Sequence, residues 1–246
     1  IRRPPRSTLS SSSAASDVYK RQIQHYLANW VGYLPQDTGL PSGMSAVDYL
    51  NWYAALYGIP ACERKQRVND LLREVDLSDK RDEKITELSG GMQQRVAIAR
   101  TLLRMPPVII VDEPTVGLDP RERIRLRNLL SKLARDRIVL ISTHVVEDVA
   151  AACERVIVIA KGELVFDGGT EELAHRATAK VWEVRTQQGV KPIIPTQSIR
   201  THETPSADGK TVHRILTSDY LDDAEPVKAT LEDGYIWLLS HTDIRT

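Results

Sequence analysis

Residues 108–113 read Val-Ile-Ile-Val-Asp-Glu, and this stretch decides the fold that the sequence predicts. Four apolar residues predict a buried strand, and Asp112 and Glu113 follow at its carboxyl end, where open α/β sheets bind ligands. Burying two adjacent carboxylates costs several kcal/mol unless a cation compensates, and a magnesium ion with a nucleotide would do so. Taken alone, the stretch also fits a strand that ends in a solvated Asp-Glu turn.

Similar apolar runs alternate with helical patterns on both sides of this strand. The runs rich in β-branched residues lie at 108–111, 138–141 and 156–159, and the helical patterns between and around them lie at 93–104, 121–135 and 146–153. This alternation predicts an α/β fold with a parallel sheet covered by helices. A further strand is expected at 31–34, with helices at 44–57 and about 63–75.

The composition changes towards both ends of the chain. Lys161-Gly162 predicts a hairpin between 156–160 and 163–166 that closes the edge of the sheet. Beyond Thr178, strand-like runs at 181–186, 211–216 and 235–239 indicate a small C-terminal α+β appendage over 179–246. Residues 1–22 are rich in Pro, Ser and Arg with no apolar periodicity, so we expect them to be disordered, and a non-native leader is one interpretation of them.

Composition excludes several classes of function. The 246 residues include 33 basic and 33 acidic side chains, so the net charge gives no reason to expect a nucleic-acid partner. The two cysteines, Cys62 and Cys153, have no metal-ligand spacing and suit reduced thiols in a cytosolic protein. No apolar run approaches the roughly 20 residues that span a bilayer, so a membrane role requires another chain.

Five segments together resemble the motifs of ABC-type ATPases. Residues 88–95, Leu-Ser-Gly-Gly-Met-Gln-Gln-Arg, are similar to the family's signature motif, and Asp112-Glu113 follow at the family's distance. Residues 114–120 resemble its D-loop, residues 142–144 its switch histidine, and residues 32–36 its Q-loop. The resemblance implies a P-loop NTPase-like domain over 23–178, with a helical subdomain at about 40–88.

The resemblance also implies a role for each site residue. Asp112 would hold Mg²⁺ through water, Glu113 would polarise the attacking water, and Gln36 would contact the metal or that water. His144 would reach the γ-phosphate of ATP. Ser89, Gly90, Gly91, Gln93 and Asp119 would contact the nucleotide across a dimer interface.

Each of these residues also has a plainer interpretation. The two glycines at a helix amino end would let backbone N–H groups approach an anion, but Ser89 alone also fits an ordinary N-cap. Asp119 fits the N-cap of a helix beginning near Pro120, a role compatible with a dimer contact. Gln36 alone would fit a surface loop, and a lone histidine at position 144 is more often structural.

The phosphate-binding loop of such ATPases, G-x-x-x-x-G-K-[ST], has no match in the 246 residues. Only Gly32 occurs among the 35 residues before Gln36, and the position five before Gly209-Lys210-Thr211 is Thr204 instead of glycine. We favour a truncated copy of an ABC ATPase, lacking its Walker A part, over a natural chain that lends its signature helix to a partner's site. Either interpretation predicts negligible ATP hydrolysis by the isolated 246-residue chain.

The resemblance implies an ATP-hydrolysing subunit of an ABC transporter that uses ATP and Mg²⁺. Its expected partners are a multi-span membrane permease in a separate chain and a second ATP-binding subunit, which would place it on the cytoplasmic face of the cell membrane. Residues 230–235 are similar to the closing segment of exporter ATPases and favour export over import. A regulatory or dimerisation module that does not bind nucleotide, and a soluble ABC protein without a transporter, are the alternatives.

One aromatic group leaves two interpretations open. Tyr49, Trp52, Tyr53 and Tyr57 fall within nine residues of a predicted helix. Such a group is typical of the core of a helical subdomain. Part of it could instead line the groove where family members receive a short helix from the membrane subunit.

Overall fold

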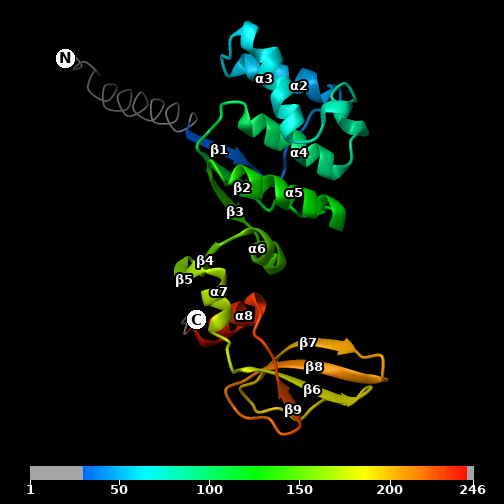
Figure 1. The fold of residues 1–246 in the computed structure, drawn as a ribbon, viewed down its shortest axis with the longest axis vertical. Coiled ribbons are helices and arrows are strands. Elements are labelled where there is room, and N and C mark those ends of the chain that lie inside the picture. Colours follow the sequence, from blue (N-terminus) through cyan, green and yellow to red (C-terminus); the bar gives the residue numbers. More distant parts are fainter. Residues whose placement is uncertain (1–29, 243–246) are drawn as a thin grey trace, which may run out of the picture. The chain divides into compact units, whose positions relative to one another are not determined.

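The computed structural model describes residues 30–242 (Figure 1), so the predictions for residues 1–22 lie outside the described residues. The chain divides into two compact units, the first ending at His144 and the second beginning at Val145. We describe each unit by itself. The domain boundaries expected at 23–178 and 179–246 stay predictions.

The first unit is built on a parallel sheet of three strands in the order β1-β2-β3. These are β1 (Val31–Leu34), β2 (Val108–Asp112) and β3 (Ile138–Ser142). The three strand predictions and their parallel arrangement are confirmed. Ile109 and Val111 are fully buried on one side of the central strand.

Helices form the rest of the first unit. They are α2 (Ala46–Leu56), α3 (Ala61–Glu74), α4 (Gly90–Leu102) and α5 (Pro120–Leu133), with short 3₁₀ turns η1 (Ser78–Lys80) and η2 (Ile85–Glu87). Helix α4 contacts β1, α2, α3 and α5, and Figure 1 shows it between the strands and the α2–α3 pair. It is therefore buried on nearly all sides, and its buried residues include Val96, Ala97, Ile98, Ala99 and Leu102.

The second unit contains a hairpin, an antiparallel sheet and three helices. The hairpin is β4 (Arg155–Ala160) with β5 (Glu163–Gly169), and the sheet has the order β7-β8-β6-β9. The sheet strands are β6 (Val181–Gln187), β7 (Ile199–Pro205), β8 (Lys210–Leu216) and β9 (Ala224–Pro226). The helices are α6 (Val146–Ala152), α7 (Thr170–His175) and α8 (Leu231–His241).

The predicted hairpin is confirmed, but its place at the edge of the parallel sheet is wrong. Among the described residues, β4 pairs with β5 alone, in a sheet of two strands. Val158 is buried, whereas Ile157 and Ile159 on the opposite face of the strand are exposed. A run of β-branched residues predicts a strand, but it does not specify which strand will be its neighbour.

The strand expected at 235–239 is also wrong, because these residues lie inside α8. A capping box begins this helix: the Thr230 hydroxyl accepts from the Asp233 amide, and the Asp233 carboxylate accepts from the Thr230 amide. The buried residues Leu231, Trp237 and Leu238 follow a helical spacing, which outweighed the strand preference of the aromatic and β-branched residues.

A largely buried ion pair joins α8 to the four-stranded sheet. Arg214 Nη2 on β8 lies 2.7 Å from Asp233 Oδ2, and Arg214 Nη1 lies 3.2 Å from Glu183 Oε1 on β6. Burial acts to raise the pKa of the Asp233 carboxyl, but hydrogen bonds from Arg214 and Thr230 lower that pKa below its ordinary value. The folded unit therefore favours the ionised form of the Asp233 carboxyl.

We predict that Asp233→Ala lowers the free energy of unfolding of the second unit by about 2 to 4 kcal/mol at neutral pH, because it removes both the helix cap and the partner of a largely buried arginine. A lowered folded pKa contributes stability above the unfolded value, about 3.9, and loses it as the pH falls through the folded value. The difference between variant and wild type should therefore shrink under acid.

Urea unfolding followed through tryptophan fluorescence, repeated from neutral to acidic pH, measures this difference. The exposed Asp222→Ala is the matched control and should change the unfolding free energy little. A pH-independent loss at Asp233, or an equal loss at Asp222, would contradict the prediction.

Candidate functional site

The carboxyl ends of the three parallel strands meet at one edge of the sheet. Leu34 on β1 pairs with Val111 on β2, which pairs with Ile141 on β3. Residues that immediately follow these strands therefore lie at the same edge. The predicted site residues Gln36, Asp112, Glu113 and His144 accordingly lie at this edge, as expected for a ligand site of an α/β sheet.

Glu113 and His144 are in direct contact at this edge. Glu113 Oε1 lies 2.6 Å from His144 Nδ1 and also accepts a hydrogen bond from the His144 backbone amide at 3.2 Å. The Glu113 backbone is held as well, because its amide donates to the Ser142 carbonyl at 2.8 Å. Its φ of 46° lies in the left-handed region, which is uncommon for glutamate and frequent at functional sites.

The second carboxylate oxygen of Glu113 has no such partner. Within residues 30–242, Glu113 Oε2 is buried and accepts no hydrogen bond from the protein. The Glu113 side chain is 19% exposed, whereas that of His144 is 75% exposed. Glu113 therefore has one oxygen fixed by a histidine and one that can accept a proton or a hydrogen bond from a water molecule.

Asp112 ends β2 beside the Glu113–His144 pair. The Tyr33 hydroxyl on β1 donates to Asp112 Oδ2 at 3.5 Å, and this tyrosine was not predicted as part of the site. The described residues contain no group of three or more His, Cys, Asp or Glu side chains that could enclose a metal. Mg²⁺ commonly uses one or two carboxylates together with water and substrate phosphates, so Asp112 and the Gln36 amide oxygen fit this ion.

The predicted phosphate cradle lies at the amino end of α4. Ser89 is the N-cap and accepts a hydrogen bond from the Met92 amide at 3.3 Å. Ser89 and Gly90 are exposed, whereas Gly91 is buried. Helix α4 has 13 residues, and its exposed amino end presents backbone N–H groups and partial positive charge, which suit an anion.

Asp119 begins α5 in the same way. Its Oδ1 accepts hydrogen bonds from the Arg121 and Glu122 amides, both at 2.9 Å. The N-cap interpretation of Asp119 is confirmed, and its contact with a partner's nucleotide stays a prediction.

Comparison with known proteins agrees with these motifs. A family model described as ABC transporter matches residues 9–116. The Nod factor export ATP-binding protein I of Burkholderia thailandensis is 33% identical over 203 residues, which are 82% of this chain and 65% of that protein. The ABC transporter ATP-binding protein NatA of Bacillus subtilis is 38% identical over 138 residues, 56% of each chain.

The chain is thus similar to ATP-binding proteins of ABC transporters. It spans less than two thirds of the length of either curated relative.

Solved structures of the family resemble the fold. The cbiO1 protein of Clostridium perfringens, part of an ABC transporter complex, matches with a TM-score of 0.59 and 30% identity over 63% of each chain. A dimeric ATP-binding cassette bound to ADP and Pi matches with a TM-score of 0.52 and 28% identity, over 61% of this chain and 66% of that one. The α/β, P-loop NTPase-like fold class is thereby confirmed.

Two residues of the ABC signature segment have structural roles that the motif did not specify. The Gln93 side-chain amide donates to the Ile85 and Leu88 carbonyls at 3.1 and 3.0 Å, so it fastens the turn before α4. Arg95 is buried and bonded to Glu122 on α5. The available signal for Arg95 was its position directly before the apolar run 96–99. The nucleotide contact assigned to Gln93 stays a prediction.

The four aromatic side chains at 49–57 differ in burial, so the core interpretation fits some of them and the partner-groove interpretation fits another. Tyr49 is buried in the core, and burial raises its pKa to about 12 although Arg100 acts to lower it. Tyr53 and Tyr57 are partly buried against the same core. Trp52 is 54% exposed and packs edge-on against Tyr53. The core interpretation is confirmed for Tyr49, and a partner contact by Trp52 stays a prediction.

The two signature glycines should respond differently to an added methyl group. A Cβ at Gly91 would lie 2.3 Å from Glu122 Oε2, whereas a Cβ at Gly90 has its nearest neighbour, Leu118 Cδ2, at 3.9 Å. We predict that Gly91→Ala lowers the free energy of unfolding of the first unit by about 1 to 3 kcal/mol through overpacking. Gly90→Ala should leave it unchanged or raise it slightly, because alanine favours helix.

Urea unfolding of the two variants, compared with wild type, measures both effects. Equal effects of the two substitutions would contradict the close approach of α4 and α5 at Gly91.

Proposed function

We propose that this chain belongs to the ATP-hydrolysing subunit of an ABC transporter, which drives export through a separate membrane permease. The observation that carries this proposal is the Glu113 carboxylate, which has one oxygen held by His144 and the other without a hydrogen-bond partner among residues 30–242. That arrangement is suited to orienting a water molecule for in-line attack on a phosphate.

In the proposed mechanism, each side chain at the sheet edge has one task. Glu113 accepts a hydrogen bond from the attacking water through Oε2, while His144 fixes the carboxylate through Oε1 and remains exposed towards the γ-phosphate. Asp112 and Gln36 would hold Mg²⁺, which offsets the negative charge of the phosphates when it is bound with ATP. Catalysis would then depend on positioning and charge stabilisation.

The amino ends of α4 and α5 would act on a second nucleotide. Ser89, Gly90 and Gly91 present an anion-binding helix end, and Asp119 lies at the start of the next helix. We propose that they face the γ-phosphate of ATP held by a second ATP-binding subunit, so that each pocket is shared between two chains. Within the 246 residues, the signature end and the sheet edge are the parts that would contribute to such pockets.

Transport is proposed from the named relatives. One relative is described as a Nod factor export protein, and the similarity of residues 230–235 to exporter segments favours the same direction. Among residues 30–242, no helix is long and apolar enough to cross a bilayer. We propose a multi-span permease as a separate chain, with this subunit on the cytoplasmic face of the membrane.

A second candidate function is a regulatory or dimerisation module with the same fold. It differs from the ATPase in having no working P-loop, the loop that supplies the amides and the lysine that clamp the β- and γ-phosphates. Equilibrium binding of labelled ATP to the product of the complete reading frame separates the two functions. Tight binding supports the ATPase, and no binding supports the module.

We predict that Glu113→Gln, made in the product of the complete reading frame, lowers kcat for ATP hydrolysis by at least about 100-fold. ATP affinity should stay within about threefold, because the substitution removes the proton acceptor and little of the phosphate clamp. The exposed Glu163→Gln is the matched control and should keep wild-type turnover. A parallel loss of ATP affinity at Glu113 would count against the assigned role.

A further inference from the structure

A buried ion pair joins the two helices whose amino ends carry the signature and D-loop residues. Arg95 on α4 and Glu122 on α5 have side chains 4% and 9% exposed, and Arg95 Nη2 lies 3.4 Å from Glu122 Oε2. The proposed mechanism uses neither side chain. Because burying two charges gives little net stability compared with apolar packing, the pair calls for another reason.

Arg95 connects α4 to a third element as well. Its Nη1 donates to the carbonyls of Val75 and Asp76 at 3.0 and 3.1 Å, which directly follow α3. Asp76 has a φ of 55°, in the left-handed region, and its carboxylate lies 3.6 Å from the same nitrogen. One guanidinium therefore fastens the end of α3, the middle of α4 and the first turn of α5.

Glu122 lies directly against the first turn of α4. Its side chain occupies the space that a Cβ on Gly91 would need, with Oε2 only 2.3 Å from that position. Its backbone amide donates to Asp119 Oδ1 at 2.9 Å. The same residue thus contacts the signature helix with its carboxylate and the N-cap of α5 with its amide. Any shift of α4 relative to α5 must displace this carboxylate.

We propose that Arg95 and Glu122 are positioning residues that hold the Ser89–Gly91 end of α4 and the Asp119 end of α5 in one fixed arrangement. Both helix ends then contact a partner's nucleotide together. A movement of α3 would displace the Arg95 guanidinium and, through it, both helix ends. The effect on turnover rests on the proposed function. The fixed arrangement itself does not, because it is a property of this chain alone.

The arrangement is tested in the 246-residue chain by hydrogen exchange with mass spectrometry, without nucleotide. We expect both Arg95→Met and Glu122→Ala to speed amide exchange at least about tenfold at 89–94 and 117–123, with the end of α3 also affected by Arg95→Met. Glu122→Gln, which keeps the shape and an acceptor for Arg95, should remain near wild type.

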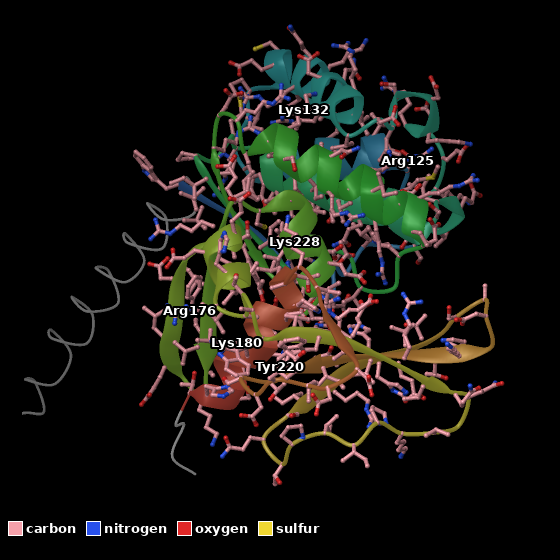
Figure 2. All side chains as sticks on the ribbon, turned by 60° about the horizontal axis from the view of Figure 1, so that its bottom comes forward. Arg125, Lys132, Arg176, Lys180, Tyr220 and Lys228 are labelled. Carbon is pink, nitrogen blue, oxygen red and sulfur yellow. The ribbon has the colours of Figure 1, made fainter. Side chains whose placement is uncertain are left out.

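The matched control is Arg125→Ala. Arg125 also pairs with Glu122, at 2.8 Å, but its side chain is 57% exposed on α5 (Figure 2), so its loss should leave exchange at 89–94 unchanged. Faster exchange confined to the mutated helix, or the same effect from Arg125→Ala, overturns the proposal.

Turnover is tested separately in the product of the complete reading frame. We expect Glu122→Ala to lower kcat at least about tenfold while ATP affinity of the monomer changes less than about twofold, and Glu122→Gln to restore most of the rate. Equal losses of kcat and affinity would indicate general destabilisation and overturn the positioning role. If the wild type hydrolyses no ATP, the proposed function fails, and the exchange experiment still decides the arrangement.

Discussion

The contact between Glu113 and His144 is the interaction on which the candidate site depends. It joins the residues that follow two neighbouring parallel strands, and it exists because Asp112 and Ser142 lie in register across β2 and β3. The histidine occupies one carboxylate oxygen, and the other has no hydrogen-bond partner in the part of the chain that the structure describes. A single register shift would turn these side chains to the opposite face and separate the pair.

Helix α4 is the element of the first unit against which a strand and three other helices pack. It is buried among β1, α2, α3 and α5, so its exposed amino end is the part that can meet a ligand. Gly91 allows the close approach to α5, and Arg95 and Glu122 fix that approach. The exposed helix end and the sheet edge are therefore two surfaces of one unit, and in the proposed arrangement they would meet two different nucleotides.

The sequence predicted the parallel sheet and the site edge because both depend on local patterns. Apolar runs that end in Asp112-Glu113 and Ser142-Thr143-His144 locate strand ends, and the parallel arrangement brings those ends together. The local pattern of a strand does not determine which strand it pairs with: the run at 156–160 pairs with β5 instead of the parallel sheet. Aromatic and β-branched residues at 235–239 favour a strand, but the capping box of Thr230 with Asp233 begins a helix there. The Q-loop resemblance gave Tyr33 no role and Glu122 lies in no motif, so only the structure shows their contacts.

The most direct test of the shared pocket is dimer formation driven by ATP. The product of the complete reading frame, carrying Glu113→Gln to prevent hydrolysis, is compared with the same protein carrying Ser89→Arg, by analytical ultracentrifugation. The account predicts an ATP-dependent dimer for the first protein, and an ATP-bound monomer for the second because arginine fills the place of a phosphate. Equal dimerisation of the two proteins would contradict it.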